Sequence, residues 1–213
     1  MYNFSQIAAF CNADLKGNFE LANNEIDFLL EIDTRKISQA NISIFFALKT
    51  ATRSGEDFLG DAYAKGVRYF VVSRSFTQFG SFPEALFAIT DNVLESLQLI
   101  ATAHRRNIDP PVLGITGSNG KTIVKEWLYS LLSPDLNVVR SPGSYNSQVG
   151  VPLSVWKLTN EMDLGIIEAG ISKPKEMSRL QNIIRPEVGL LTNIGTAHIE
   201  NFTSVLEILH EKL

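Results

Sequence analysis

Cysteine is nearly absent from this 213-residue chain, which contains only Cys11. A single cysteine forms no internal disulfide, so a small secreted scaffold held together by disulfides is excluded and a reducing compartment is favoured. Because Cys11 follows an early helical stretch, we expect it to be a small buried apolar side chain.

Long apolar runs and an excess of basic residues are also missing. No run approaches the roughly 18 residues that a membrane helix needs, and the N-terminal stretch MYNFSQIAAFCNADL lacks the basic and apolar regions of a signal peptide. The net charge of −4 and the pI near 5.4 argue against general binding to nucleic acid or to an anionic membrane. We therefore expect a cytoplasmic protein without a nucleic-acid partner or membrane insertion, in which any anion site is local.

What the chain does contain is enough apolar sequence, 45% of its residues, to bury a substantial core. Its first third mixes short strand-like runs with short helical patterns and predicts a small α/β domain over residues 1–84. The strand-like runs are GNFELA, IDFLLEID, ISIFFAL and VRYFVVS, and the helical patterns surround SQIAAF and DFLGDAYAKG.

Residues 85–213 follow a different pattern, in which continuously apolar strands alternate with amphipathic helices. This alternation predicts crossover units and a buried, mainly parallel sheet. The last helix begins with a capping box, Ser204 to Glu207, and no closing strand follows it. We therefore expect the N-terminal part of a larger domain. The strands are expected at VLGIT, NVV, DLGIIEAG and EVGLLTNIG, and the helices at 92–107, 121–132, 149–158 and 175–184.

The stretch GITGSNGKT (114–122) lies between the strand VLGIT and an amphipathic helix, which is the setting of a phosphate-binding loop. Glycines let backbone N–H groups converge on phosphate oxygens, Lys121 would reach the β and γ phosphates, and Thr122 would hold Mg²⁺. Ile115 stands where the general pattern has its first glycine, and a glycine-rich turn without ligand is the alternative. The residues expected to bind ATP are Gly117, Ser118, Asn119, Gly120, Lys121 and Thr122.

Three further residues are candidates for a metal site. Glu168 closes the strand DLGIIEAG, where open α/β sheets bind ligands, and could share Mg²⁺ with Thr122; it could instead cap the next helix. His198, in TAHIE, also follows a strand, although a lone histidine is more often structural. Lys212 falls within the apolar stripe of the last helix, which predicts that it is paired, chemically altered or snorkelling to solvent near a frayed end.

The loop SPGSYNSQVGVPLS (141–154) is rich in turn and amide residues and runs into a helix. Its amides could bind phosphate or substrate, and a helix-capping loop is the alternative. Spacing alone does not decide between these two interpretations.

Together these segments resemble the Mur ligases, the ATP-dependent amide-forming enzymes of peptidoglycan synthesis. GITGSNGKT matches the TGxxGKT loop of the family, and YNSQVGVPLS resembles its NNxxGxP segment, with Ser147 in place of the second asparagine. The resemblance extends over essentially the whole chain and is strongest to the ligases that add D-alanyl-D-alanine.

The resemblance also implies metal ligands. IIEAGISKPKEMSRL resembles the segment that carries the magnesium-binding glutamate, here Glu168, and LLTNIGTAHIENF resembles the segment whose histidine, here His198, binds a second Mg²⁺. Lys212 lies at the offset of a lysine that is carbamylated in the family and helps to hold this second metal. The resemblance thus makes Thr122, Glu168, His198 and Lys212 metal-site residues, and Lys121, Glu168, His198 and Lys212 catalytic.

In the first domain, DTRKIS and FFALKTATRSGEDF resemble the uridine-nucleotide-binding domain of these ligases. The resemblance implies that Thr34 and Arg35 contact the UDP portion of the substrate, and it makes Asn146 a substrate-binding residue. The DTRK and EAGISKPKEM segments favour the D-alanyl-D-alanine-adding branch over its sister ligases.

The implied reaction joins D-alanyl-D-alanine to UDP-N-acetylmuramoyl-tripeptide through an acyl phosphate, with ATP and Mg²⁺ as cofactors. Family members have a longer central domain and a C-terminal domain beyond the position of Leu213, and some chains continue into an alanine racemase. We therefore expect the isolated chain not to ligate. The alternatives are another Mur-type ligase, a folylpolyglutamate synthase, or a non-catalytic P-loop nucleotide-binding module.

Overall fold

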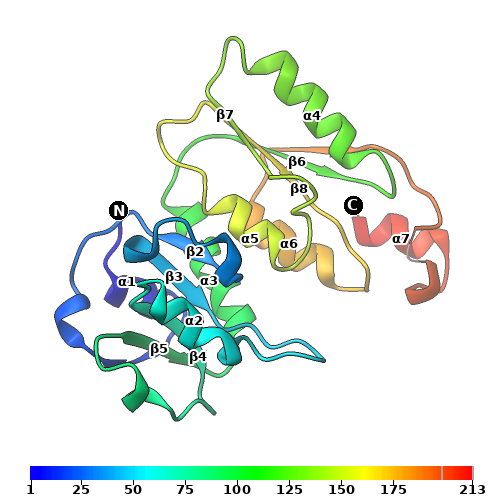
Figure 1. Cartoon of the computed structure of the whole chain (residues 1–213). Helices are drawn as coiled ribbons and strands as arrows, with labels where there is room; N and C mark the ends of the chain where they lie inside the picture. The colour runs from blue at the N-terminus through cyan, green and yellow to red at the C-terminus, as the bar shows by residue number, and fades with distance from the viewer. Residues whose placement is uncertain (198, 213) are drawn as a thin grey trace. The chain divides into compact units, whose positions relative to one another are not determined.

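Two sheets, one in each half of the chain, organise the fold (Figure 1). The computed structural model describes residues 1–197 and 199–212. The chain divides into two compact units, Met1–Ile100 and Ala101–Leu213, and the division falls within the helix α3 (Val93–Arg106). The α/β fold class predicted from the sequence is confirmed.

The first unit contains a five-stranded sheet of order β1-β5-β4-β3-β2. All neighbouring strands pair in parallel except β1, which is antiparallel to β5. Its strands are β1 (Asp14–Gly17), β2 (Leu29–Glu31), β3 (Ser43–Phe46), β4 (Tyr69–Ser73) and β5 (Leu86–Thr90).

Helices cover both faces of this first sheet. Side chains alternate along a strand, so Tyr69 and Phe70 of β4 point to opposite faces. The Tyr69 ring lies 5.1 Å from the ring of Phe4 in α1 (Phe4–Phe10). Phe70 belongs to the buried cluster that includes the inner side of α2 (Leu59–Ala64). The sheet is therefore buried between α1 on one face and α2 on the other.

The strand predicted at GNFELA is wrong. The chain leaves β1 at Gly17, whose φ of +119° is accessible mainly to glycine, and forms a short 3-10 turn at Phe19–Leu21. The Asn18 side chain caps this turn by accepting the N–H of Glu20 at 3.1 Å. Local capping chemistry thus outweighs the strand-like composition.

The predicted boundary between residues 84 and 85 also differs from the structure. The stretch LFAIT forms β5, which pairs with β4 on one side and β1 on the other, so residues 86–90 belong to the first sheet. An apolar strand has the same composition whichever sheet it joins, and only its partners reveal the assignment.

The second unit contains a four-stranded, entirely parallel sheet of order β7-β8-β6-β9. This agrees with the parallel sheet predicted from alternating apolar strands and helices. Its strands are β6 (Val112–Thr116), β7 (Val138–Arg140), β8 (Leu164–Glu168) and β9 (Val188–Leu191).

Helices also cover both faces of the second sheet (Figure 1). Ile166 of β8 points towards α4 (Lys121–Leu132), whereas Ile167 packs against α5 (Gly150–Val155) and α6 (Glu176–Ile184). The last helix, α7 (Val205–Lys212), packs against α6. No helix in the described residues is long and apolar enough to cross a membrane.

The apolar residues of α4 do not all face the sheet. Val124 and Leu128 pack against the strands, but Ile123, Trp127 and Leu131 are 57%, 71% and 71% exposed. At 100° per residue these two sets form adjacent stripes, and the sheet contacts only one of them.

The topology creates a crevice at the carboxyl ends of β6 and β8. The helix that follows β6, α4, lies on one face of the sheet, and α6, which follows β8, lies on the other. The segments leaving these neighbouring strands therefore diverge, which is the position where open α/β sheets bind ligands.

Candidate functional site

The loop at residues 117–120 leaves β6 and enters α4 with two glycines in the left-handed region. Gly117 has a φ of +140° and Gly120 a φ of +81°. A Cβ atom on Gly117 would lie 2.0 Å from the Thr192 hydroxyl. Glycine is thus required at position 117 both for the backbone conformation and for the close approach of the next segment.

The segment after β9 holds this loop in place. The Asn193 carbonyl accepts the N–H of Ser118, and its side-chain oxygen accepts the N–H of Asn119, each at 2.9 Å. The Thr192 hydroxyl donates to the Asn119 carbonyl at 2.6 Å, and the N–H of Gly195 donates to the Ser118 hydroxyl at 2.9 Å. The first turn of α4 has no intrahelical acceptors for its N–H groups, so these remain to bind an anion.

Lys121 begins α4 and bends back over the loop, where its ammonium donates to the Gly117 carbonyl at 2.7 Å. Burial lowers the pKa of Lys121, and the nearby Glu168 carboxylate opposes that shift. The lysine lies where a phosphate above the loop would meet its charge.

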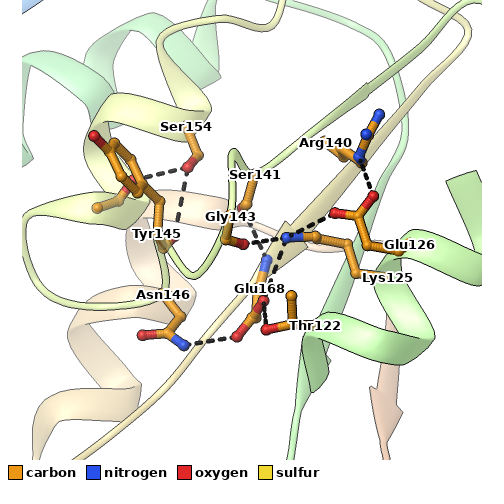
Figure 2. A network of polar contacts seen from close by, with 11 residues as sticks. Thr122, Lys125, Glu126, Arg140, Ser141, Gly143, Tyr145, Asn146, Ser154 and Glu168 are labelled. Carbon is orange, nitrogen blue, oxygen red and sulfur yellow. Dashed lines mark hydrogen bonds and ion pairs between the residues drawn. The ribbon is translucent and has the colours of Figure 1, made fainter. Parts of the chain in front are cut away.

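Glu168 ends β8 and is fully buried, with both carboxylate oxygens engaged (Figure 2). One oxygen accepts the Thr122 hydroxyl at 2.9 Å and lies 3.5 Å from the Lys125 ammonium. The other accepts the Asn146 side-chain amide at 2.6 Å. These contacts connect Glu168 with the phosphate-binding loop and with the 141–154 loop. Glu168 does not cap the next helix, α6: the N–H groups of Ser172 and Lys173 before that helix are accepted by Glu176.

The loop at residues 141–154 contacts both Glu168 and the start of α5. Asn146 faces Glu168, and Gly170 permits this approach, because a Cβ there would lie 3.0 Å from the Asn146 side chain. Ser147 instead accepts the N–H of Gly150 at 3.2 Å at the start of α5. Ser147 thus holds the N–H of the first residue of α5, although Val149 is the N-cap residue of that helix.

Lys212 is buried, with 8% of its surface exposed, as its position in the apolar stripe of α7 predicts. Its ammonium lies 3.5 Å from the Gly117 carbonyl. Burial lowers the pKa of Lys212 to about 8; Lys121 lowers it further and Glu211 opposes the shift. Glu211 also accepts the N–H of Met177 in α6 at 2.9 Å, which anchors α7 to α6.

A cavity of about 410 Å³ lies at this end of the sheet. Glu168 does not line it but contacts the lining residue Asn146. His198 falls outside the described residues, although Ala197 lines the cavity. The lining residues that bear on ligand binding are Gly117, Ser118, Lys121, Asn146, Gly170 and Lys212.

The donors at Thr122 and Glu168 suit Mg²⁺. Both are oxygen ligands, and Mg²⁺ typically binds one or two carboxylates together with phosphate oxygens and waters. Within residues 1–197 and 199–212, no three or more His, Cys, Asp or Glu side chains gather in a metal cluster. The described residues therefore fit a cation completed by a phosphate ligand better than one caged by protein alone.

Thr34 and Arg35 lie in the first unit, in the 3-10 turn Thr34–Lys36 that follows β2. Thr34 is buried, and its carbonyl accepts the Lys65 ammonium at 2.6 Å. The Arg35 side chain is 86% exposed and forms two hydrogen bonds with the Asp33 carboxylate, which hold the pKa of Asp33 at about 2. The guanidinium is thus presented on the surface of a fixed turn.

We expect Asn193→Ala to weaken binding of Mg-ATP by roughly 5- to 10-fold, because the Asn119 N–H loses its acceptor and the loop loosens. Isothermal titration calorimetry checks this value. Asn182→Ala, an exposed change in α6, serves as the control and should bind as the wild type does. Unchanged affinity in Asn193→Ala would show that this contact does not shape the loop.

No motif in the sequence singles out Thr192 and Asn193. The only signal available was their place after a strand parallel to β6, which puts them at the same edge of the sheet as the loop.

Known proteins show the same sequence pattern and fold. Residues 115–213 match the family model described as the Mur ligase middle domain. The UDP-N-acetylmuramoyl-tripeptide--D-alanyl-D-alanine ligase of Borreliella burgdorferi is 34% identical, covering 92% of this chain and 44% of the relative. That of Escherichia coli is 32% identical over 98% of the chain and 43% of the relative.

Solved structures of MurF have a similar fold. A MurF of Acinetobacter baumannii superposes with a TM-score of 0.84 at 22% identity, covering 99% of this chain and 45% of that one, which shows the shared fold. A MurF ligase of Thermotoga maritima in complex with ADP has a TM-score of 0.75 at 27% identity, with coverages of 87% and 42%. The chain spans less than half the length of these relatives. Residues 115–213 thus match the Mur ligase family, and the chain as a whole is similar to MurF, the D-alanyl-D-alanine-adding ligase.

Proposed function

We propose that this chain carries the ATP site and the uridine-substrate site of a ligase that adds D-alanyl-D-alanine to UDP-N-acetylmuramoyl-tripeptide. The observation that carries the proposal is the contact of Thr122 and Asn146 with the buried carboxylate of Glu168 beside the phosphate-binding loop. A loop that bound nothing would not require a buried carboxylate next to its threonine, because burying that charge costs free energy.

In this proposal ATP lies over the loop with its phosphates at the N-terminus of α4. The free N–H groups of the first turn and the Lys121 ammonium hold the β and γ phosphates, and Lys121 exchanges the Gly117 carbonyl for a phosphate oxygen. Thr122 and Glu168 would hold Mg²⁺, which supplies charge neutralisation at the phosphates. Asn146 keeps the carboxylate oriented towards the loop.

Lys212, which lines the cavity, and His198, which lies outside the described residues, are the proposed residues of a second cation site. The lowered pKa of Lys212 increases the fraction of neutral amine, which is the form that reacts with CO₂ to give a carbamate. The burial of Lys212 beside the Gly117 carbonyl supports this proposal, because a carbamate there would lie near a phosphate bound over the loop.

The reaction then proceeds in two displacements. The terminal carboxylate of the tripeptide attacks the γ phosphorus, the bond to the β–γ bridging oxygen breaks, and ADP leaves. The amine of D-alanyl-D-alanine attacks the acyl carbon of the resulting acyl phosphate and expels phosphate. The residues named above contribute chiefly by positioning the reactants and neutralising their charge.

The relatives extend beyond the region that this chain matches, so we propose that the dipeptide binds to parts outside these 213 residues and that this chain alone does not ligate. The cytoplasmic location and a fusion to alanine racemase remain predictions. Binding of ATP without any response to the uridine substrate would favour a P-loop nucleotide-binding module without turnover.

Arg35→Ala is expected to weaken binding of UDP-N-acetylmuramoyl-tripeptide by about 10-fold or more, because an exposed guanidinium that contacts the diphosphate is lost. Calorimetric titration measures this affinity, with Mg-ATP titrated in parallel and expected to bind unchanged. Arg74→Ala is the matched control, since Arg74 also forms surface ion pairs in the first unit. No saturable uridine binding by the wild type would contradict the proposed substrate.

A further inference from the structure

Lys125 is a fully buried lysine in α4 that the proposed reaction does not use (Figure 2). Its ammonium donates to the Gly143 carbonyl and lies 3.3 Å from a Glu126 carboxylate oxygen and 3.5 Å from Glu168. A buried ammonium costs free energy unless it is paired and hydrogen-bonded. Here the carbonyl and the two carboxylates around the ammonium lie on the loop at residues 141–154, on α4 and on β8.

The charge of Lys125 matters most for Glu168. The other side-chain donors to this carboxylate are the Thr122 hydroxyl and the Asn146 amide, which are both neutral. Among the described residues, Lys125 is therefore the cation within ion-pair distance of Glu168, and the Lys121 ammonium acts on this carboxylate from farther away. Glu126 is 42% exposed and is itself paired with Arg140 at 2.9 Å, so its charge is balanced from another side.

Lys125 also connects the parts of the site. Through Gly143 it holds the same loop that presents Asn146 to Glu168. One side chain thus ties the loop, the carboxylate strand and the helix that carries Thr122. Movement of any one of these would disturb the ammonium's contacts with the other two.

We propose that Lys125 is a positioning residue that acts as a resident counter-cation: it keeps the Glu168 carboxylate in place before Mg²⁺ binds. The inference rests on the proposed function, in which Glu168 is a Mg²⁺ ligand. It follows that a divalent cation can take over part of the stabilising role of the ammonium. In the wild type, Mg²⁺ alone adds little stability, because Glu168 already has a cation.

The test is thermal unfolding of the full 213-residue chain with MgCl₂ and with NaCl of equal ionic strength. Lys125→Met, which keeps the length of the side chain, is expected to melt about 10 °C lower in NaCl. MgCl₂ should restore at least half of that loss. The double variant Lys125→Met with Glu168→Gln should melt above Lys125→Met in NaCl and should show no response to Mg²⁺. Lys157→Met, at an exposed lysine, is the control for loss of a positive charge.

An equal loss of stability in MgCl₂ and NaCl would overturn the inference, because it would reduce Lys125 to a packing role. If Lys125→Met yields no folded protein in either salt, the folding of the double variant tests the charge pairing between Lys125 and Glu168. Its folding would support the charge pairing, and its failure to fold would overturn it. Calorimetry of the wild type with Mg-ATP separates the two claims: absence of binding contradicts the proposed function, whereas binding without rescue of Lys125→Met contradicts only this inference.

Discussion

Lys121→Ala is expected to weaken binding of Mg-ATP by ~30-fold or more. The Lys121 ammonium is partly buried at the N-terminus of α4, so fewer water molecules compete for a phosphate oxygen there than at a fully exposed lysine. Removing one partner of such a charge pair typically costs about 2–5 kcal/mol, and 1.4 kcal/mol corresponds to a factor of ten in affinity. The variant also loses the hydrogen bond to the Gly117 carbonyl, which loosens the free loop.

Calorimetric titration with a non-hydrolysable ATP analogue and Mg²⁺ measures this effect. Lys157→Ala, at an exposed lysine after α5 in the same unit, is the matched control and should bind with wild-type affinity. The melting temperature of Lys121→Ala should stay within a few degrees of the wild type, so that weak binding is not mistaken for unfolding. An affinity within about threefold of the wild type would show that the lysine does not contact phosphate.

Gly117→Ala should damage both stability and nucleotide binding. A φ of +140° is strained for alanine, and the added methyl group would meet the Thr192 hydroxyl at 2.0 Å. Backbone strain of this kind costs about 1–3 kcal/mol before the clash is counted, so the second unit should melt roughly 5 °C or more below the wild type. Affinity for Mg-ATP should fall at least ~10-fold, because the loop must move away from Thr192.

Two glycine variants separate the causes of this effect. Gly189→Ala, where an added Cβ meets no described atom within 4 Å, should change neither property by a measurable amount. Gly120→Ala has open space but a φ of +81°, so it tests backbone strain without a clash. If Gly117→Ala melts and binds as the wild type does, the close packing of the loop against the segment after β9 is not needed for the site.

The phosphate-binding loop and its flanking elements were predictable from sequence because their determinants are local. The apolar run VLGIT and the helical spacing after Gly120 gave the bounds of β6 and α4 as the structure has them. The inward position of Lys212 followed from the angular spacing of a single helix. Periodicity and glycine placement act over a few residues, so one sequence suffices to interpret them.

The strand partners and the loop contacts were not predictable in the same way. LFAIT joined the first sheet because β4 and β1 flank it, and the GNFELA stretch became a turn because Asn18 caps it. These outcomes depend on which partner or cap is present in three dimensions. Composition and period carry little information about that choice.

In the candidate site, the sequence already predicted that Glu168 could share Mg²⁺ with Thr122, because both residues follow parallel strands, and the structure brings the two side chains to 2.9 Å. Other contacts of the site were not predictable from the sequence. Lys125 went unnoticed because a lysine within a helix normally faces solvent, and its burial depends on Gly143, which is 18 residues away. Thr192 and Asn193 contact the loop from more than 70 residues away, so no local pattern marks them.

The magnesium-nucleotide site is tested most directly by the affinity of the wild-type chain for ATP in MgCl₂ and in EDTA, compared with Glu168→Gln. We predict one saturable site that binds at least ~10-fold more tightly with Mg²⁺, and a Glu168→Gln variant that loses most of this difference. Equal affinity in MgCl₂ and EDTA, or a Glu168→Gln variant that retains the full effect of Mg²⁺, would contradict the claim that Thr122 and Glu168 form a magnesium-nucleotide site.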